Sequence, residues 1–226
     1  TDLDGTGAYF CACSQGDKDG FGLLECKTGK SFKELAKEID EIIGNKQEEW
    51  ERREVTYAEQ LRPVAKTTTR SAYLASRGLE VAPGLLWATD VKYNEDGEVA
   101  GRYAAMLGPI VRKGEWQTFH VTYLDKGKKA PVKCQRKILP GGSSSGGGVE
   151  LYPAAEEMGV SEGIETAIAA KMLFDIPTHA AISTSGMAKW EPPSITKIVH
   201  IFADHDENLA GHAAAWTLAH RLKLLG

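Results

Sequence analysis

The sequence predicts a mixed fold in which an α+β part precedes an α/β part with a Rossmann-like, doubly wound parallel sheet. Three observations carry this prediction. Residues 85–124 contain alternating stretches separated by turns, which is typical of antiparallel strands. After residue 148, strand-like and helix-like stretches alternate, which is typical of a parallel sheet with flanking helices. Between them, the Gly/Ser segment 141–148 cannot bury apolar surface, so we expect a flexible linker there.

Residues 1–44 are predicted to form a small hairpin-rich element followed by one helix. Residues 1–26 are rich in Gly and Asp and hold short apolar pieces. The helix over 31–43 follows from apolar residues at helical spacing, with a capping box of Ser31 and Glu34 at its start. Gly44 ends it, and the highly charged residues 45–70 indicate a connector.

Residues 71–140 are predicted to form an α+β module. A short helix over 71–78 ends at Gly78. The expected strands are 85–91, 103–111 and 116–124, with turns at 95–97 and 126–127.

Residues 149–226 are predicted to form the parallel sheet with its helices. The expected strands are 158–161, 179–183 and 197–203, and the expected helices are 165–174 and 211–225.

The net charge of −4 hides a strong local asymmetry. Residues 102–140 hold nine basic and two acidic side chains, whereas residues 150–209 hold ten acidic and three basic ones. A basic block beside an acidic block suits a surface that binds a polyanion next to a cluster that binds cations, although a solvated charged hairpin gives the same count. No apolar run approaches the roughly 18 residues of a membrane span, and the first twenty residues do not resemble a signal peptide. We therefore expect a cytoplasmic protein without a membrane partner.

Cys11 and Cys13 lie between an aromatic pair and a Gly-rich turn. Such a pair can supply two of the four ligands of a structural zinc ion. The chain offers no second pair, so either the remaining ligands lie upstream of Thr1 or the two thiols are small buried hydrophobes.

Three carboxylates follow predicted strands of the carboxyl-terminal part. Glu162 comes directly after one apolar strand, and Asp204 and Asp206 come after another. Open parallel sheets place their ligands at the carboxyl ends of strands, and gathered carboxylates repel one another unless a cation neutralises them. Oxygen ligands favour Mg²⁺ or Mn²⁺. The alternative is that these acids are solvated or cap the next helix.

The segments VSEGIETAIAA, from Val160, and IFADHDENLAGHAAAWTLAHRL, from Ile201, resemble the TOPRIM domain, whose signature is a strand-ending Glu-Gly and a later Asp-x-Asp. Within that superfamily the chain resembles the primase domains of phage and plasmid primase-helicases. Residues 72–79, 122–125, 128–131 and 136–139 resemble the basic module that precedes TOPRIM there, and residues 9–32 resemble the second half of a zinc-binding ribbon. The chain departs from the family in the spacing of Cys11 and Cys13, which is C-x-C where C-x-x-C is usual. The first Cys pair of the ribbon and a further TOPRIM strand with its acidic motif are missing, so the resemblance implies a fragment trimmed at both ends.

The resemblance implies a DNA primase that makes short RNA primers on single-stranded DNA from NTPs during phage or plasmid replication. Glu162, Asp204 and Asp206 are the implied catalytic residues and ligands of Mg²⁺ or Mn²⁺, and Cys11 and Cys13 are half of a zinc site. The implied nucleotide and template contacts are Arg136, Lys137, Lys133, Lys128 and Lys129. A replicative helicase is an implied partner.

Two other functions fit the same residues. A TOPRIM nuclease would use the three acids with water in place of the primer hydroxyl. A module without catalysis would bind single-stranded DNA or a replication partner, with its acids merely solvated.

Overall fold

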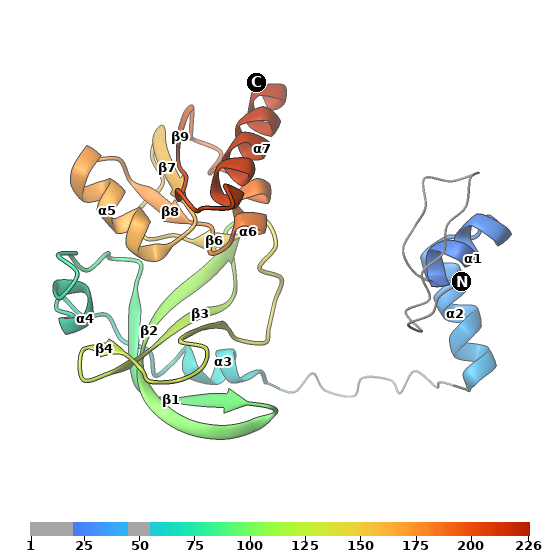
Figure 1. Ribbon diagram of the computed structural model, residues 1–226, viewed down its shortest axis with the longest axis horizontal. Coiled ribbons are helices and arrows are strands. Elements are labelled where there is room, and N and C mark those ends of the chain that lie inside the picture. Colours follow the sequence, from blue (N-terminus) through green and yellow to red (C-terminus); the bar gives the residue numbers. More distant parts are fainter. Residues whose placement is uncertain (1–19, 45–54) are drawn as a thin grey trace. The chain divides into compact units, whose positions relative to one another are not determined.

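The computed structural model describes residues 20–44 and 55–226. The chain divides into two compact units, Thr1–Glu54 and Val55–Gly226 (Figure 1). The expected connector over 45–70 thus falls partly outside the described residues, and its last part belongs to the second unit.

The first unit contains two helices, α1 (Gly20–Thr28) and α2 (Phe32–Ile43). The predicted capping box is present, with Ser31 and Glu34 bonded reciprocally, and Gly44 ends α2 with a φ of 68°. Helix α1 corrects the expectation of hairpins for residues 20–26. Its Phe21 ring packs on Phe32 of α2, with ring centroids 4.6 Å apart, and such packing outweighs the weak helix propensity of the glycines in this stretch.

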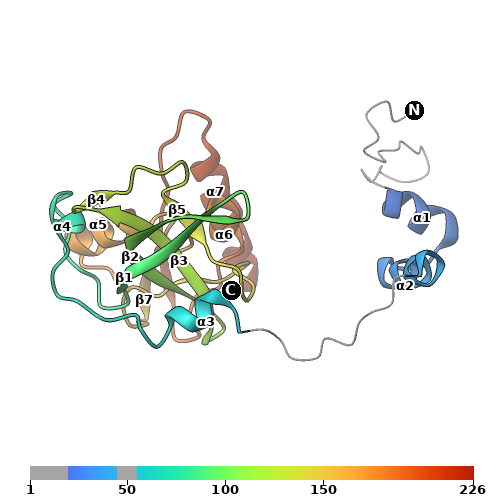
Figure 2. The same ribbon diagram turned by 90° about the horizontal axis from the view of Figure 1, so that it is seen from below.

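The second unit contains an antiparallel sheet in its first part. Its strands are β1 (Leu86–Glu95), β2 (Glu98–Arg112), β3 (Glu115–Asp125), β4 (Lys128–Lys129) and β5 (Arg136–Ile138), which pairs with β3. Both residues of the turns Asp96-Gly97, Lys113-Gly114 and Lys126-Gly127 have positive φ, as two-residue hairpin turns require. Helices α3 (Tyr57–Leu61) and α4 (Ala72–Ala75) flank these long strands (Figure 2). The three predicted strands are therefore confirmed and are longer than expected.

The carboxyl-terminal part holds a parallel sheet, as predicted. Strand β7 (Glu157–Ser161) pairs in parallel with β8 (Thr178–Ala180) and with β9 (Ile198–Phe202). Helix α5 (Ile164–Phe174) covers one face of these strands, and α7 (Ala210–Leu225) covers the other (Figure 1). The short helix α6 (Thr184–Lys189), which packs beside α7, was not expected and is capped by the Ser183 hydroxyl.

The Gly/Ser segment 141–148 differs from the flexible linker that its composition indicates. Strand β6 (Gly148–Val149) pairs with both β2 and β8, so one sheet of order β4-β3-β2-β6-β8-β7-β9 joins the two parts. Residues 146–148 are buried. A Cβ on Gly148 would lie 2.8 Å from the Ala180 carbonyl oxygen, and one on Gly147 would lie 2.7 Å from that of Val111. These glycines therefore permit a close approach of backbones.

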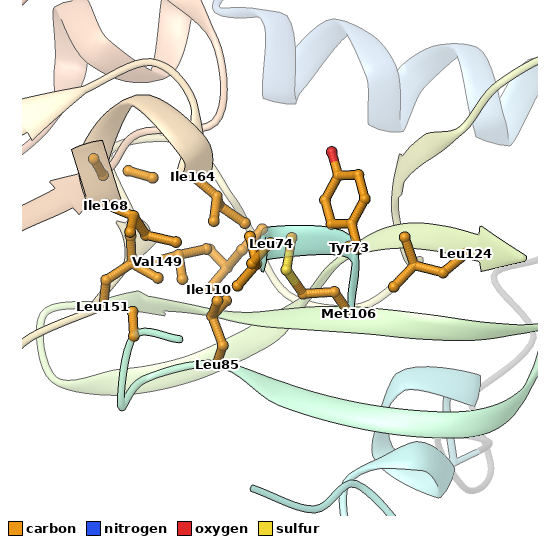
Figure 3. Close-up of a cluster of buried hydrophobic side chains, with 13 residues drawn as sticks. Tyr73, Leu74, Leu85, Met106, Ile110, Leu124, Val149, Leu151, Ile164 and Ile168 are labelled. Carbon is orange, nitrogen blue, oxygen red and sulfur yellow. The ribbon is translucent and has the colours of Figure 1, made fainter. Parts of the chain in front are cut away.

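A shared hydrophobic core fixes α4 and α5 on the sheet. Tyr73 and Leu74 of α4 pack with Met106 of β2 and with Ile164 and Ile168 of α5 (Figure 3). The position of α5 matters for function, because its first turn borders the site described next. Within the described residues, no helix is both long and apolar enough to cross a membrane.

Candidate active site

Two of the predicted acids lie where parallel strands end side by side. Strands β7 and β9 are in register with Ser161 opposite Phe202, so Glu162 and Asp204 follow the carboxyl ends of neighbouring strands. Helix α7 begins close to Asp204, and a Cβ on Gly211 would lie 2.5 Å from the Asp204 carbonyl oxygen. The small residue at the helix start thus allows the turn 204–209 to fold back beside the strand ends.

Glu162 and Asp204 line one pocket of about 240 Å³. The pocket lies between the strand ends of the parallel sheet and strands β3 and β5 of the antiparallel part. Its lining is His120, Arg136, Lys137, Ile138, Glu162, Gly163, Ile164, Glu165, Ile182 and Asp204. Asp206 is exposed and does not line the pocket, although its charge acts on Glu162.

The electrostatics of Glu162 indicate a place for positive charge. Burial raises the pKa of its carboxyl group, and the charges of Asp204 and Asp206 raise this pKa further. Its Oε2 atom is buried without a hydrogen-bond partner in the described part of the chain. The Thr166 hydroxyl donates to Asp204 Oδ1 at 3.3 Å and so orients that carboxylate. A bound cation would relieve both the repulsion and the unsatisfied oxygen.

The donor set fits Mg²⁺ or Mn²⁺ by chemistry, because carboxylate oxygens are the ligands that hard cations prefer. Over residues 20–44 and 55–226, no three His, Cys, Asp or Glu side chains come close enough together to enclose an ion. Mg²⁺ commonly binds through one or two carboxylates and completes its shell with water and substrate phosphates. Glu162 and Asp204, with Asp206 nearby, are the residues that would hold it.

Arg136 brings the opposite charge to the same pocket. Its Nη2 donates to Glu165 Oε1 at 3.1 Å, and the Tyr73 hydroxyl donates to the same oxygen at 2.6 Å. Burial would raise the pKa of Glu165, but the Tyr73 hydrogen bond and the Arg136 charge lower it overall. Burial, together with Glu165, raises the pKa of Tyr73 to about 12, so the phenol remains a donor. The network joins α4, α5 and β5.

His120 is a second buried polar residue of the pocket. Its side chain is 7% exposed, and its Nδ1 has no hydrogen-bond partner among the described residues. Burial lowers the pKa of His120 to about 4, with a smaller contribution from the Arg136 charge. The imidazole is therefore neutral at physiological pH.

The structure separates the predicted basic contacts. Arg136 and Lys137 both border the pocket, but the Lys137 ammonium lies 4.2 Å from the Tyr93 ring centroid and donates to the Asn94 carbonyl oxygen. Burial lowers the pKa of Lys129, and the Arg136 charge lowers it further. Lys133 lies 4.0 Å from Glu95, and neither Lys133 nor Lys128 lines the pocket.

Sequence reasoning did not find Tyr73, His120 or Glu165. Glu165 lies in the first turn of α5, where an acidic residue is favoured by the helix dipole alone, so its type carries no signal for a site. His120 stands in an alternating strand and carries no signal at all. Cys11 and Cys13 lie outside the described residues, so the half zinc site stays a prediction.

Comparison with known proteins gives matches to two family models. Residues 157–226 match the family model described as the Toprim domain, and residues 49–151 match a domain of unknown function, DUF7146. Among solved structures, the primase fragment of the bacteriophage T7 primase-helicase protein is similar over 95% of this chain and 77% of that chain. The identity is 16% and the TM-score is 0.45. Curated proteins give no match.

Proposed function

We propose that this chain, whose residues 157–226 form a TOPRIM domain, is a DNA-templated primase that makes short RNA primers by metal-dependent nucleotidyl transfer. The observation that carries the proposal is the composition of the 240 Å³ pocket. Acids from the TOPRIM domain form one wall and Arg136 from β5 stands in the other. A bound NTP needs both walls, because its phosphates would contact the metal ion held by the acids and the guanidinium of Arg136.

The reaction joins two nucleotides. The primer 3′-hydroxyl oxygen bonds to the α-phosphorus of the incoming NTP, the bond from that phosphorus to the bridging oxygen of the β-phosphate breaks, and pyrophosphate leaves with the electron pair. A divalent ion held by the acids supplies neutralisation of phosphate charge and a lower pKa of the attacking hydroxyl.

The residues of the chain have separate tasks in this scheme. Asp204 is held by Thr166, and Glu162 either completes the metal site or accepts the hydroxyl proton, for which a raised carboxyl pKa is suited. Arg136 binds the triphosphate by charge-assisted hydrogen bonds. The start of α5, at Gly163 and Ile164, borders the pocket and presents the positive end of a helix dipole to phosphate. Lys128, Lys129 and Lys133 are proposed template contacts, and a replicative helicase is a proposed partner.

Incorporation of labelled NTPs on single-stranded DNA with Mg²⁺ tests the proposal. We expect short RNA products that fall at least about 100-fold in Asp204→Ala, because removing a group that stabilises transition-state charge costs about this much. Asp206→Ala should reduce the yield less, because that side chain is exposed outside the pocket. Glu157→Ala, at the opposite end of β7 from Glu162, is the matched control and should retain activity.

Other outcomes favour the rival functions. Cut DNA without any need for NTPs would indicate a nuclease. DNA binding that survives Asp204→Ala, without products from the unaltered protein, would indicate a binding module. Titration calorimetry with Mn²⁺ adds a direct check: binding that does not depend on Glu162 or Asp204 contradicts both enzymes.

A further inference from the structure

We propose that Glu165 is a positioning residue of the nucleotide site, which holds the Arg136 guanidinium at the pocket for the triphosphate and is itself fixed by Tyr73. The inference rests on the proposed function and deepens it. The Glu165 carboxylate is not among the proposed metal ligands.

The carboxylate of Glu165 is held in place from two sides. The residue stands in the first turn of α5, whose Ile164 and Ile168 are packed in the core with α4. The Tyr73 ring belongs to the same core, and its oxygen points away from the apolar cluster (Figure 3). That hydroxyl donates to Glu165 Oε1 at 2.6 Å. The acceptor for Arg136 is therefore fixed before any substrate arrives.

Arg136 is not fixed by its own strand. Strand β5 is three residues long, and the Arg136 side chain is 44% exposed, whereas that of Glu165 is 13% exposed. Within the described residues, the ion pair to Glu165 is the one that Arg136 makes. A long side chain loses rotamer entropy when it is immobilised, so holding it in advance removes that cost from substrate binding.

The guanidinium is held where its field reaches the reaction site. Its charge acts on both Glu162 and His120, and all three residues line the same pocket. Glu162 follows strand β7 and directly precedes Gly163, the N-cap of α5, whereas Glu165 stands in the first turn of that helix. The passage of the chain from the end of β7 into α5 thus links the acid of the metal side to the residue that anchors Arg136.

Two opposite consequences of removing the Glu165 charge can be told apart. If Glu165 only neutralised Arg136, then Glu165→Gln would strengthen triphosphate binding. If Glu165 positions Arg136, the same change weakens binding by about fivefold to tenfold, because the amide oxygen of Gln holds the guanidinium by a neutral hydrogen bond in place of a charge-assisted one. Tyr73→Phe should weaken it less, because only the anchor is loosened.

The experiment combines Mg-ATP affinity, the KM for ATP in primer synthesis, and NMR of the Arg136 Nε–H group, with its resonance assigned by Arg136→Lys. We expect Glu165→Gln to raise Kd and KM, to change kcat less than about threefold, and to make the Arg136 resonance dynamic. Glu165→Asp should recover part of the affinity. In the cycle of Glu165→Gln with Arg136→Gln, the double variant should bind ATP as Arg136→Gln does, since residues that act as one unit are not additive.

Each contrary result has a definite meaning. An Arg136 resonance that stays ordered in Glu165→Gln, or additive losses in the cycle, overturns the positioning role. Tighter ATP binding by Glu165→Gln does the same. If the unaltered protein has an ordered Arg136 and binds ATP normally but makes no primers, the primase function is overturned and the positioning role remains supported. Glu157→Gln is the control for the loss of a carboxylate elsewhere on the TOPRIM domain.

Discussion

At the scale of single residues, the pocket holds polar atoms that the folded chain leaves unsatisfied. Glu162 Oε2 and His120 Nδ1 both belong to lining residues, and both are buried without a partner in the described part of the chain. Each such atom costs about 1–3 kcal/mol. Sites that bind ligands commonly carry such costs, because the ligand supplies the missing partner. The two unsatisfied atoms agree with the proposal of a ligand at this position.

His120 makes the stability of the protein depend on pH. Its pKa is about 4 in the folded protein, against an ordinary value of 6.5, and the charged groups that act on it are Arg136 and Glu165. Between these two pH values the unfolded chain binds a proton that the folded chain does not, so lowering the pH favours unfolding. We expect the free energy of unfolding, relative to His120→Gln, to fall by about 3 kcal/mol from pH 7 to pH 4, at 1.4 kcal/mol per unit of pKa.

Urea denaturation at a series of pH values measures this difference. The exposed His220, changed to Gln, is the control for loss of a histidine. Curves for the unaltered protein and His120→Gln that run parallel from pH 7 to pH 4 would show that the imidazole is not buried as described.

At the scale of elements, the Gly/Ser segment 141–148 is partly buried in the sheet, whereas its composition indicates a flexible linker. Gly148 lies in a strand between β2 and β8, and a Cβ there would lie 2.8 Å from the Ala180 carbonyl oxygen. Backbone atoms in the middle of a sheet cannot move aside. Gly148→Ala should therefore reduce the free energy of unfolding by about 1–3 kcal/mol, the usual cost of overpacking.

Chemical denaturation of Gly148→Ala beside Ser145→Ala checks this expectation, since Ser145 is exposed in the same segment. Equal stability of the two variants would mean that the segment is a linker after all.

The elements that sequence predicts well here are those whose signal is local. The capping box at Ser31, the X-Gly turns and the alternation of β1 to β3 depend on neighbouring residues only. The role of residues 146–148 depends on which backbones approach them, and the helical state of residues 20–28 depends on packing with α2. For the same reason Glu162 and Asp204 were predictable from strand ends, whereas the contacts of Tyr73 with Glu165, 92 residues apart, were not.

At the scale of the whole molecule, the two charged blocks meet across one sheet. Part of the basic excess in residues 102–140 is paired within the protein: Lys113 with Glu191 at 3.7 Å and Arg136 with Glu165 at 3.1 Å. Arg102 is paired with Asp90 on the neighbouring strand. The net charge of a segment therefore overstates the number of groups that are available to a nucleic acid.

Lys128 is a basic residue suited to testing which charges would contact the proposed DNA template. It is exposed directly after the turn between β3 and β4, next to α4 and outside the pocket. A lysine that contacts a phosphate of single-stranded DNA releases a counterion and contributes about 0.7 to the slope of log affinity against log salt. We expect Lys128→Ala to weaken binding at low salt and to lower the slope by about 0.7.

Lys197→Ala removes a lysine that is paired with Glu156 at 2.7 Å, at the far end of β7 from the pocket, and should leave the slope unchanged. Fluorescence anisotropy with a labelled oligonucleotide at several salt concentrations measures both variants, and an equal slope for the two would remove Lys128 from the template path.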